Sequence, residues 1–216
     1  MIQTLRLWLI DRRIDLRYGW RALWARRNRR RLVIAALAAA GLWQLGAGLA
    51  LHAKAWLAQT LIEQAWQRNL AEARPHARPW AWADTTAVAR ITFVEQARSL
   101  IVLDGDSGRV LAFGPGRRAG SPLPGSAGNS VVSGHRDTHF RILEQVAPGQ
   151  HVEVERLDGR HRTYRVVATR VVDRRDLGVV ADRGIDELTL VTCWPFDAIR
   201  PGGPLRYVVS AVADGA

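Results

Sequence analysis

The sequence predicts an all-β domain that follows an N-terminal membrane-spanning helix. Two observations lead to this prediction. From Val88 onward, short apolar runs alternate with Gly, Pro, Asp or Asn, as strands alternate with turns. Before them, residues 32–51 form a run of twenty without a formally charged side chain, which is long enough to span a hydrocarbon core of about 30 Å.

The predicted strands are short and lie close together in the sequence. Eight strands with little helix in about 130 residues favour a closed barrel or a sandwich. Closure would remove the exposed edges that such short strands otherwise leave. The strands are expected at Val88–Val94, Leu100–Leu103, Val110–Phe113, Ser130–Ser133, His151–Leu157, Thr163–Val172, Leu188–Thr192 and Tyr207–Val212.

The net charge of +11 belongs to the amino terminus. Residues 1–31 hold ten arginines and two aspartates, a net charge of +8. Residues 32–83 hold four basic and two acidic side chains, whereas residues 84–216 hold seventeen basic and sixteen acidic ones. Because the predicted domain is nearly neutral, nucleic-acid binding by a basic face of it is disfavoured.

Residues 1–31 are predicted to be a basic cytoplasmic amphipathic segment. Its apolar residues share one helical stripe, and arginines flank them. Such a helix would lie on the inner membrane surface, where anionic lipid attracts arginine. A disordered basic leader is the alternative. The stripe consists of Ile2, Leu5, Leu9, Leu16, Trp20 and Leu23.

Residues 32–53 are predicted to be a single-pass transmembrane anchor. Arginines precede the span and only Lys54 follows it closely, so the amino terminus is expected in the cytoplasm. The domain would then lie on the outer side of the cell inner (cytoplasmic) membrane, which is the periplasm in a Gram-negative host. A cleaved signal peptide is the competing interpretation, but the leader and the apolar run exceed its usual dimensions.

Residues 54–83 are predicted to be a juxtamembrane helix and a linker rich in proline and tryptophan. The first part is rich in Ala, Leu, Gln and Glu, and Pro75 and Pro79 would end its helix. Residues 84–216 would form the folded domain, and a chain that begins near Arg78 is expected to fold by itself.

The only cysteine, Cys193, stands where an apolar strand must end, because Pro195 cannot donate to a ladder. The Pro201–Pro204 turn then reverses the chain into a second apolar run, with Arg206 near its start. A thiol and a guanidinium could therefore face one cleft, an arrangement suited to acyl transfer. One cysteine excludes an intramolecular disulfide and does not identify the redox compartment.

A histidine at another strand end can supply the base that a thiol needs. His135 follows the apolar run that begins at Ser130, and a free thiol with a pKa of about 8.5 is mostly protonated at neutral pH. Asp137 would orient His135 or cap the strand end. His135 and His139 are four residues apart, but without an HExxH pattern we predict neither a metal site nor a cofactor.

Three short motifs, TLVTC at Thr189–Cys193, GHRD at Gly134–Asp137 and LRY at Leu205–Tyr207, resemble the signature of the sortases. These are membrane-anchored cysteine transpeptidases, and the subgroup found in marine proteobacteria is the most similar. The resemblance covers roughly residues 80–212.

The resemblance implies an eight-stranded sortase-like β-barrel with Cys193, His135 and Arg206 as the catalytic residues. It also implies cleavage of an LPxTG-like C-terminal sorting signal in a protein substrate. The acyl group would pass through a thioacyl-enzyme to an amine acceptor that the sequence does not identify. Two alternatives are a cysteine hydrolase that uses the same site with water, and a non-enzymatic, membrane-tethered barrel that captures peptides.

The connection Asp173–Asp186 is too long for a hairpin. By resemblance to sortases it would be a wall of the substrate groove. Its apolar members Leu177, Val179 and Val180 would contact an extended peptide, or they would only pack the loop onto the barrel. Thr192, beside the nucleophile, is predicted to contact the substrate as well.

Overall fold

The computed structural model describes residues 2–73, 76–200 and 202–214, and the side chains of residues 2–28 and of Leu177 lie outside the description. The chain divides into two compact units, residues 1–54 and 55–216. The two units are therefore described separately.

The first unit is part of one long helix, α1 (Ile2–Ala71). No proline interrupts this stretch, and it is rich in alanine and leucine, the residues with the highest helix propensity. The segment from Arg29 has a mean hydropathy of 1.8 in its most apolar window and is long enough to cross a membrane. The predicted stripe between residues 2 and 23 lies outside the side chains that the structure describes.

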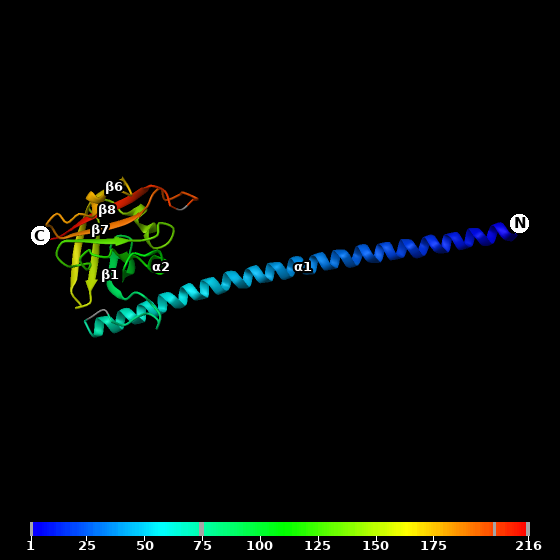
Figure 1. The fold of residues 1–216 in the computed structure, drawn as a ribbon, viewed down its shortest axis with the longest axis horizontal. Coiled ribbons are helices and arrows are strands. Elements are labelled where there is room, and N and C mark those ends of the chain that lie inside the picture. The colour runs from blue at the N-terminus through cyan, green and yellow to red at the C-terminus, as the bar shows by residue number, and fades with distance from the viewer. Residues whose placement is uncertain (1, 74–75, 201, 215–216) are drawn as a thin grey trace. The chain divides into compact units, whose positions relative to one another are not determined.

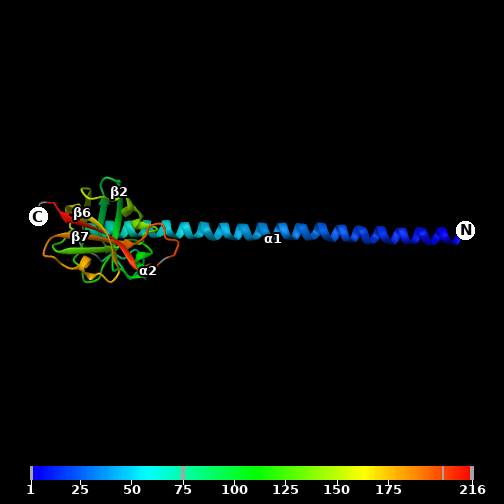
Figure 2. The same cartoon turned by 90° about the horizontal axis from the view of Figure 1, so that it is seen from above.

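The second unit contains a closed β-barrel of eight strands (Figures 1 and 2), which confirms the predicted fold and excludes the sandwich. The strands follow the order β1-β2-β3-β4-β7-β8-β6-β5, and β2–β3 and β4–β7 are parallel pairs. Their bounds are β1 (Ala87–Phe93), β2 (Arg98–Asp104), β3 (Gly116–Arg117), β4 (Asn129–Ser133), β5 (His151–Arg156), β6 (His161–Asp173), β7 (Glu187–Cys193) and β8 (Leu205–Ala213).

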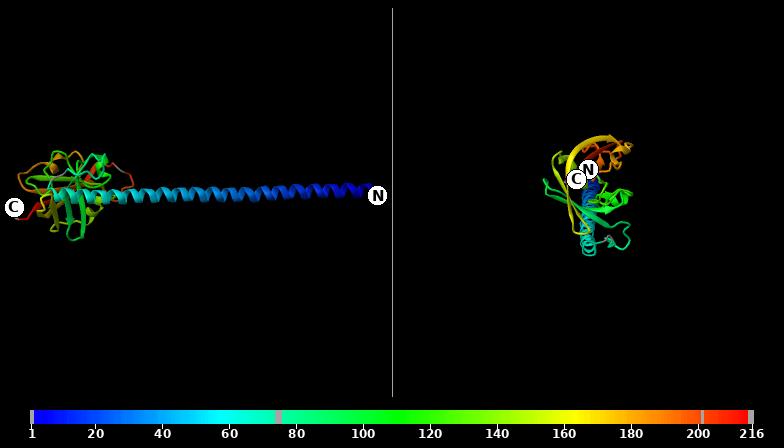
Figure 3. Two further views of the ribbon diagram at one scale, coloured as in Figure 1. Left: turned by 90° about the horizontal axis from the view of Figure 1, so that it is seen from below. Right: turned by 90° about the vertical axis from the view of Figure 1, so that its left-hand side faces the viewer.

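Alternation along the strands fills the barrel with apolar side chains. The right-hand view in Figure 3 shows strands curving around this interior. Phe93, Tyr164 and Leu190 are fully buried in it, and so is Phe140 of the 3-10 helix η1 (His139–Gln145). Val132 of β4 and both Leu188 and Leu190 of β7 face inward. Because side chains alternate along a strand, the residues next to them face outward.

The predicted strand Val110–Phe113 is wrong, because its first half belongs to a short helix, α2 (Gly108–Leu111), and its second half is a turn. The hydroxyl of Ser107 accepts a hydrogen bond from Val110 N and caps the first turn, which stabilises helix over strand. Val110 is buried against Leu103. The strand of this region is the two-residue β3, which follows α2.

The last turns of α1 pack on the barrel and belong to its unit, which begins at residue 55. Trp66 is fully buried against Ala87 and Leu157. The Asn69 side chain, also fully buried, donates to Ala87 O at 3.0 Å and accepts from Ala77 N at 2.7 Å. The helix therefore supplies part of the core, and a chain that begins near Arg78 would lack these contacts; that such a chain folds by itself stays a prediction.

Candidate active site

The ends of β4 and β7 meet at the same edge of the barrel, because the two strands are parallel. Ser133 is the register partner of Val191, and Gly134 N continues the ladder by donating to Val191 O at 3.1 Å. The Thr192 hydroxyl donates to Gly134 O at 2.7 Å. The ladder ends at Gly134, and His135 is the next residue of the chain, at the edge of the barrel where β7 ends in Cys193.

Gly134 is required where the chain leaves β4. A Cβ at this position would lie 2.6 Å from Cγ of the buried Phe140, so any larger residue would displace the ring or the strand end. The chain then turns at His135, whose carbonyl accepts from Phe140 N at 3.0 Å. His135 is exposed at this turn. Packing beneath Gly134 therefore determines where the imidazole emerges.

Cys193 and Arg206 are directly opposed on the antiparallel strands β7 and β8. Trp194 N donates to Leu205 O at 3.2 Å, so the next pair outward is a hydrogen-bonded one. Because such pairs alternate, Cys193 and Arg206 form a non-hydrogen-bonded pair, in which the Cα atoms are about 4.5 Å apart and the side chains are closest. Thr192 faces inward, so Cys193 faces outward, and the thiol is half-buried.

The guanidinium of Arg206 is held by the loop before β8. Its Nη1 donates to Gly203 O and to Leu205 O, both at 2.8 Å. Among the described residues, Nε and Nη2 have no acceptor, so these two donors remain available to a bound molecule. Pro201 of the predicted turn lies outside the described residues.

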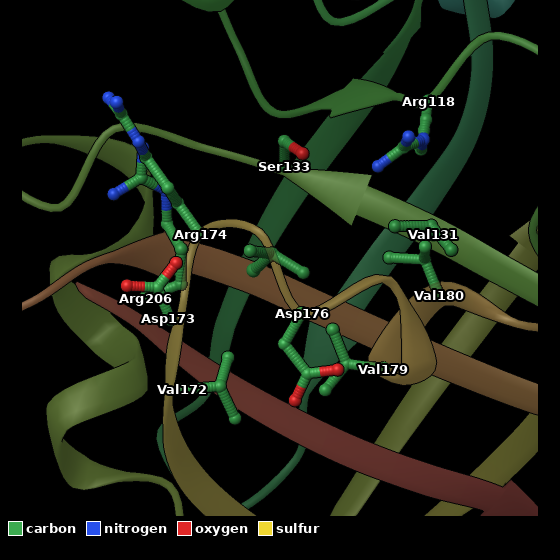
Figure 4. A pocket seen from close by; sticks show the side chains of 11 residues that line it. Arg118, Val131, Ser133, Val172, Asp173, Arg174, Asp176, Val179, Val180 and Arg206 are labelled. Carbon is green, nitrogen blue, oxygen red and sulfur yellow. The ribbon is translucent and has the colours of Figure 1, made fainter. Parts of the chain in front are cut away.

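A cleft of ≈ 150 Å³ lies on the outer face of β4, β7 and β8, beneath the 3-10 helix η2 (Leu177–Val180). Figure 4 shows Val179 and Val180 of η2 on one side of it, with the strands beneath. Its lining residues are Arg118, Val131, Ser133, Val172, Asp173, Arg174, Asp176, Val179, Val180, Val191 and Arg206.

Comparison with known proteins identifies the family. A model of the sortase domain matches residues 93–214, more than half of the chain. The chain belongs to the sortase family. This is the family that the sequence motifs resemble.

Individual relatives support this assignment. Sortase D of Bacillus subtilis (strain 168) is 32% identical over 111 residues, which are 51% of this chain and 55% of that protein. The match thus spans about half the length of this relative. Sortase C-1 from Actinomyces oris is 29% identical with a TM-score of 0.54, and the match covers 59% of this chain and 73% of that one.

The barrel itself is shared more widely. A Clostridium perfringens Sortase D5 transpeptidase has a TM-score of 0.53 at 24% identity, over 60% of this chain and 79% of that one. At this identity the likeness shows the fold alone. The predicted eight-stranded sortase-like barrel is therefore the fold observed.

The residues that were predicted to contact the substrate do not all lie in the cleft. Val179 and Val180 line the cleft, whereas the Leu177 side chain lies outside the described residues. Thr192 differs from the prediction: its side chain is only 2% exposed and bonds Gly134 instead of lining the cleft. The reason is the strand period of two, which turns Thr192 inward when Cys193 faces outward.

Several cleft residues were not predicted. Val131, Ser133 and Val191 alternate with core residues of β4 and β7, so strand periodicity would have found them once those strands were known to be neighbours. Arg118 and Arg174 come from loops, and no spacing in the sequence marks them.

The structure shows which groups Asp137 and His139 contact. The exposed Asp137 carboxylate accepts from Arg136 Nε at 3.0 Å, and no described contact joins it to His135. His139 Nδ1 lies 3.2 Å from the Thr138 hydroxyl. Burial and the nearby positive charges of His135 and Arg98 lower the pKa of His139.

The connection from β6 to β7 is fastened at its far end to the start of β4. Asp186 accepts from Gly128 N at 2.9 Å and pairs with Arg162, and these contacts lower the pKa of its carboxyl group. Asn129 Nδ2 donates to Ala181 O at 3.1 Å. The connection that walls the cleft is therefore anchored to the start of β4 and, through Arg162, to β6.

Proposed function

We propose that the chain is a membrane-anchored cysteine transpeptidase that cleaves an LPxTG-like C-terminal sorting signal and transfers the acyl group to an amine. One observation carries the proposal. Cys193 and Arg206 are directly opposed beside a cleft, and His135 leaves the neighbouring strand at the same edge. Nucleophile, oxyanion donor and proton carrier thus come from three adjacent strands.

Each of the three side chains has one role. The Cys193 thiolate attacks a backbone carbonyl of the signal, and the resulting tetrahedral oxyanion accepts hydrogen bonds from Nε or Nη2 of Arg206. Collapse of this intermediate breaks the C–N bond, and His135 donates a proton to the departing amine. The incoming amine then attacks the thioester, gives a proton to His135 and releases the Cys193 thiolate.

The cleft supports an extended, partly apolar peptide as the substrate. Val172, Val179 and Val180 offer apolar surface to side chains such as leucine and proline, and Arg206 lines the same cleft. We assign Val179 and Val180 to the substrate-binding wall, together with Leu177. The amine acceptor is a separate molecule whose identity the cleft does not specify.

Membrane anchoring would bring enzyme and substrate together. If both carry a transmembrane segment, diffusion in one membrane raises their effective concentration. We propose residues 1–31 as the cytoplasmic segment, 32–53 as the anchor, 54–83 as the juxtamembrane part and 84–216 as the catalytic barrel on the outer side of the inner membrane. Assignment to the marine proteobacterial subgroup is part of this proposal and rests on the sequence motifs.

Product analysis with a synthetic LPxTG-like peptide tests the function. We expect a covalent adduct on Cys193 by mass spectrometry, and ligation to an added amine such as triglycine. The Cys193→Ala variant removes the only thiol with little change in volume, so it should fold and form neither product. Ligation by purified Cys193→Ala would contradict the proposal.

A cysteine hydrolase is the competing function, because His135 is exposed and water can reach it. The two functions differ in their products when an amine is present. A transpeptidase forms the amide and suppresses the hydrolysed product as the amine concentration rises. Hydrolysis that no amine suppresses would favour the hydrolase.

A further inference from the structure

Arg136 links the loop after β4, which contains His135, to the loop after β7, which follows Cys193. It is the neighbour of His135, yet only 3% of its surface is exposed. Its Nη1 donates to Pro195 O at 2.8 Å, and its Nη2 donates to Ala198 O at 2.6 Å and to Arg200 O at 3.3 Å. One guanidinium therefore bonds three carbonyls of the loop after Cys193.

We propose that Arg136 is a positioning residue that sets His135 relative to Cys193, an inference that rests on the proposed function. The guanidinium does not touch the substrate, since it is buried beneath the loop. It acts through the backbone, because His135 precedes it directly and Pro195 is two residues after Cys193. Each end of the link is thus within two residues of a reacting group.

The number and direction of these bonds favour a positioning role over simple packing. The two segments are also joined by Gly134, through its bonds to Val191 and Thr192, and by Arg141, whose Nη1 donates to Phe196 O at 2.6 Å. Of the two arginines, Arg136 is the neighbour of His135 and makes three of the carbonyl bonds. Misplacement of a reacting group by about 1 Å can cost on the order of 10²-fold in rate.

The chemistry of the site calls for arginine and not lysine. A guanidinium presents donors in a rigid plane and can reach several carbonyls at once, whereas an ammonium is a flexible point charge. The Nε atom completes the set by donating to Asp137 at 3.0 Å. Burial of a cation is costly unless it is paired and hydrogen-bonded, and all three guanidinium nitrogens are used here.

The main test is Arg136→Lys, which keeps the positive charge and removes the planar set of hydrogen-bond donors. We expect kcat with the LPxTG-like peptide to fall tenfold or more, while KM changes less than threefold, because the cleft is untouched. Arg90→Lys is the control, since Arg90 is likewise ion-paired, with Glu63 and Glu155, but is only partly buried and stands on β1. It should keep kcat.

A double-mutant cycle separates positioning from stability and needs no substrate. The alkylation rate of Cys193 by iodoacetamide is measured for wild type, His135→Gln, Arg136→Lys and the double variant. If Arg136 positions His135, the effect of replacing His135 should be at least threefold smaller once Arg136 is lysine. Multiplicative effects, together with an unchanged kcat for Arg136→Lys, would overturn the proposal.

Asp137→Asn provides the test if Arg136→Lys does not fold. It weakens only the bond to Nε, on an exposed side chain, and leaves the three carbonyl bonds intact. We expect a twofold to fivefold loss in kcat with KM unchanged; an unchanged kcat would then overturn the proposal. Absence of peptide turnover in the wild type, with coupled alkylation rates, would instead contradict the proposed function alone.

Discussion

Cys193 and Arg206 stand directly opposite each other on β7 and β8, with their side chains on the outer face of the barrel. Beneath them, Trp194 stacks on Tyr207 with ring centroids 5.6 Å apart. Phe196 packs edge-on against Tyr207 at 5.2 Å. Since the pairing and the aromatic contacts hold both strand ends, Cys193 and Arg206 are kept opposite each other before any substrate arrives.

Arg206→Lys should keep the fold and the charge but lose the planar donors. Loss of one oxyanion donor typically costs about 10²–10³ in kcat, and we expect that range for lysine and at least as much for alanine. The melting temperature should stay within a few degrees. Arg170→Lys, an exposed arginine on β6, is the control. Normal transpeptidation by Arg206→Ala would remove Arg206 from the mechanism.

Val180→Asp should weaken substrate binding more than catalysis. The carboxylate would enter the apolar wall of the cleft, away from the opposed pair, so a contact made equally in ground and transition states is lost. We expect KM for the peptide to rise about tenfold, equivalent to roughly 1.4 kcal/mol, with kcat nearly unchanged. Val167→Asp, on an exposed position of β6, should change neither constant.

A chain of residues 55–216 should be more stable than one of residues 78–216. The shorter chain lacks Trp66, Ile62 and the buried Asn69, all of which pack on the barrel. Loss of a buried tryptophan alone costs about 3–5 kcal/mol. At roughly 2–4 °C per kcal/mol, the melting temperature should fall by about 6–20 °C. Equal melting temperatures by circular dichroism would contradict the packing of α1.

His139 should make stability depend on pH in the mildly acidic range. Its pKa is lowered in the folded state, so below about 6.5 the unfolded chain binds more protons. The stability that His139 contributes in its neutral form is therefore complete above that pH. It is lost as the pH falls through the pKa that His139 has in the folded state. Urea unfolding at pH 7 and pH 5.5 should show a larger loss in wild type than in His139→Gln. Equal losses would contradict this assignment.

Protease added outside sealed spheroplasts should digest the barrel and spare the first 31 residues. The basis is the arginine cluster before the apolar segment of α1, which predicts a cytoplasmic amino terminus. Two tags, one at each end of the chain, would report the two sides by immunoblot. Full protection of the C-terminal tag in intact spheroplasts, with digestion after lysis, would reverse the proposed orientation.

The sequence by itself determined the features that depend on local order. Short apolar runs separated by turn residues identified seven of the eight strand regions, and Cys193 and Arg206 were predicted to share a cleft because a turn-rich segment joins their strands. The apolar run of residues 32–51 likewise determined the candidate membrane span. Each of these signals lies within a short stretch, so the residues that carry it are neighbours in the chain.

Tertiary structure decided what depends on contacts between distant segments. The parallel pairing of β4 with β7 joins residues nearly sixty positions apart, and it brings the end of β4, which His135 follows, to the edge where β7 ends in Cys193. The same holds for Arg136, whose carbonyl partners lie in another loop, and for Trp66, whose pocket is formed by Ala87 and Leu157. Periodicity shows that a residue is buried or exposed, but only the folded chain selects the partner, because many pairings satisfy the same pattern.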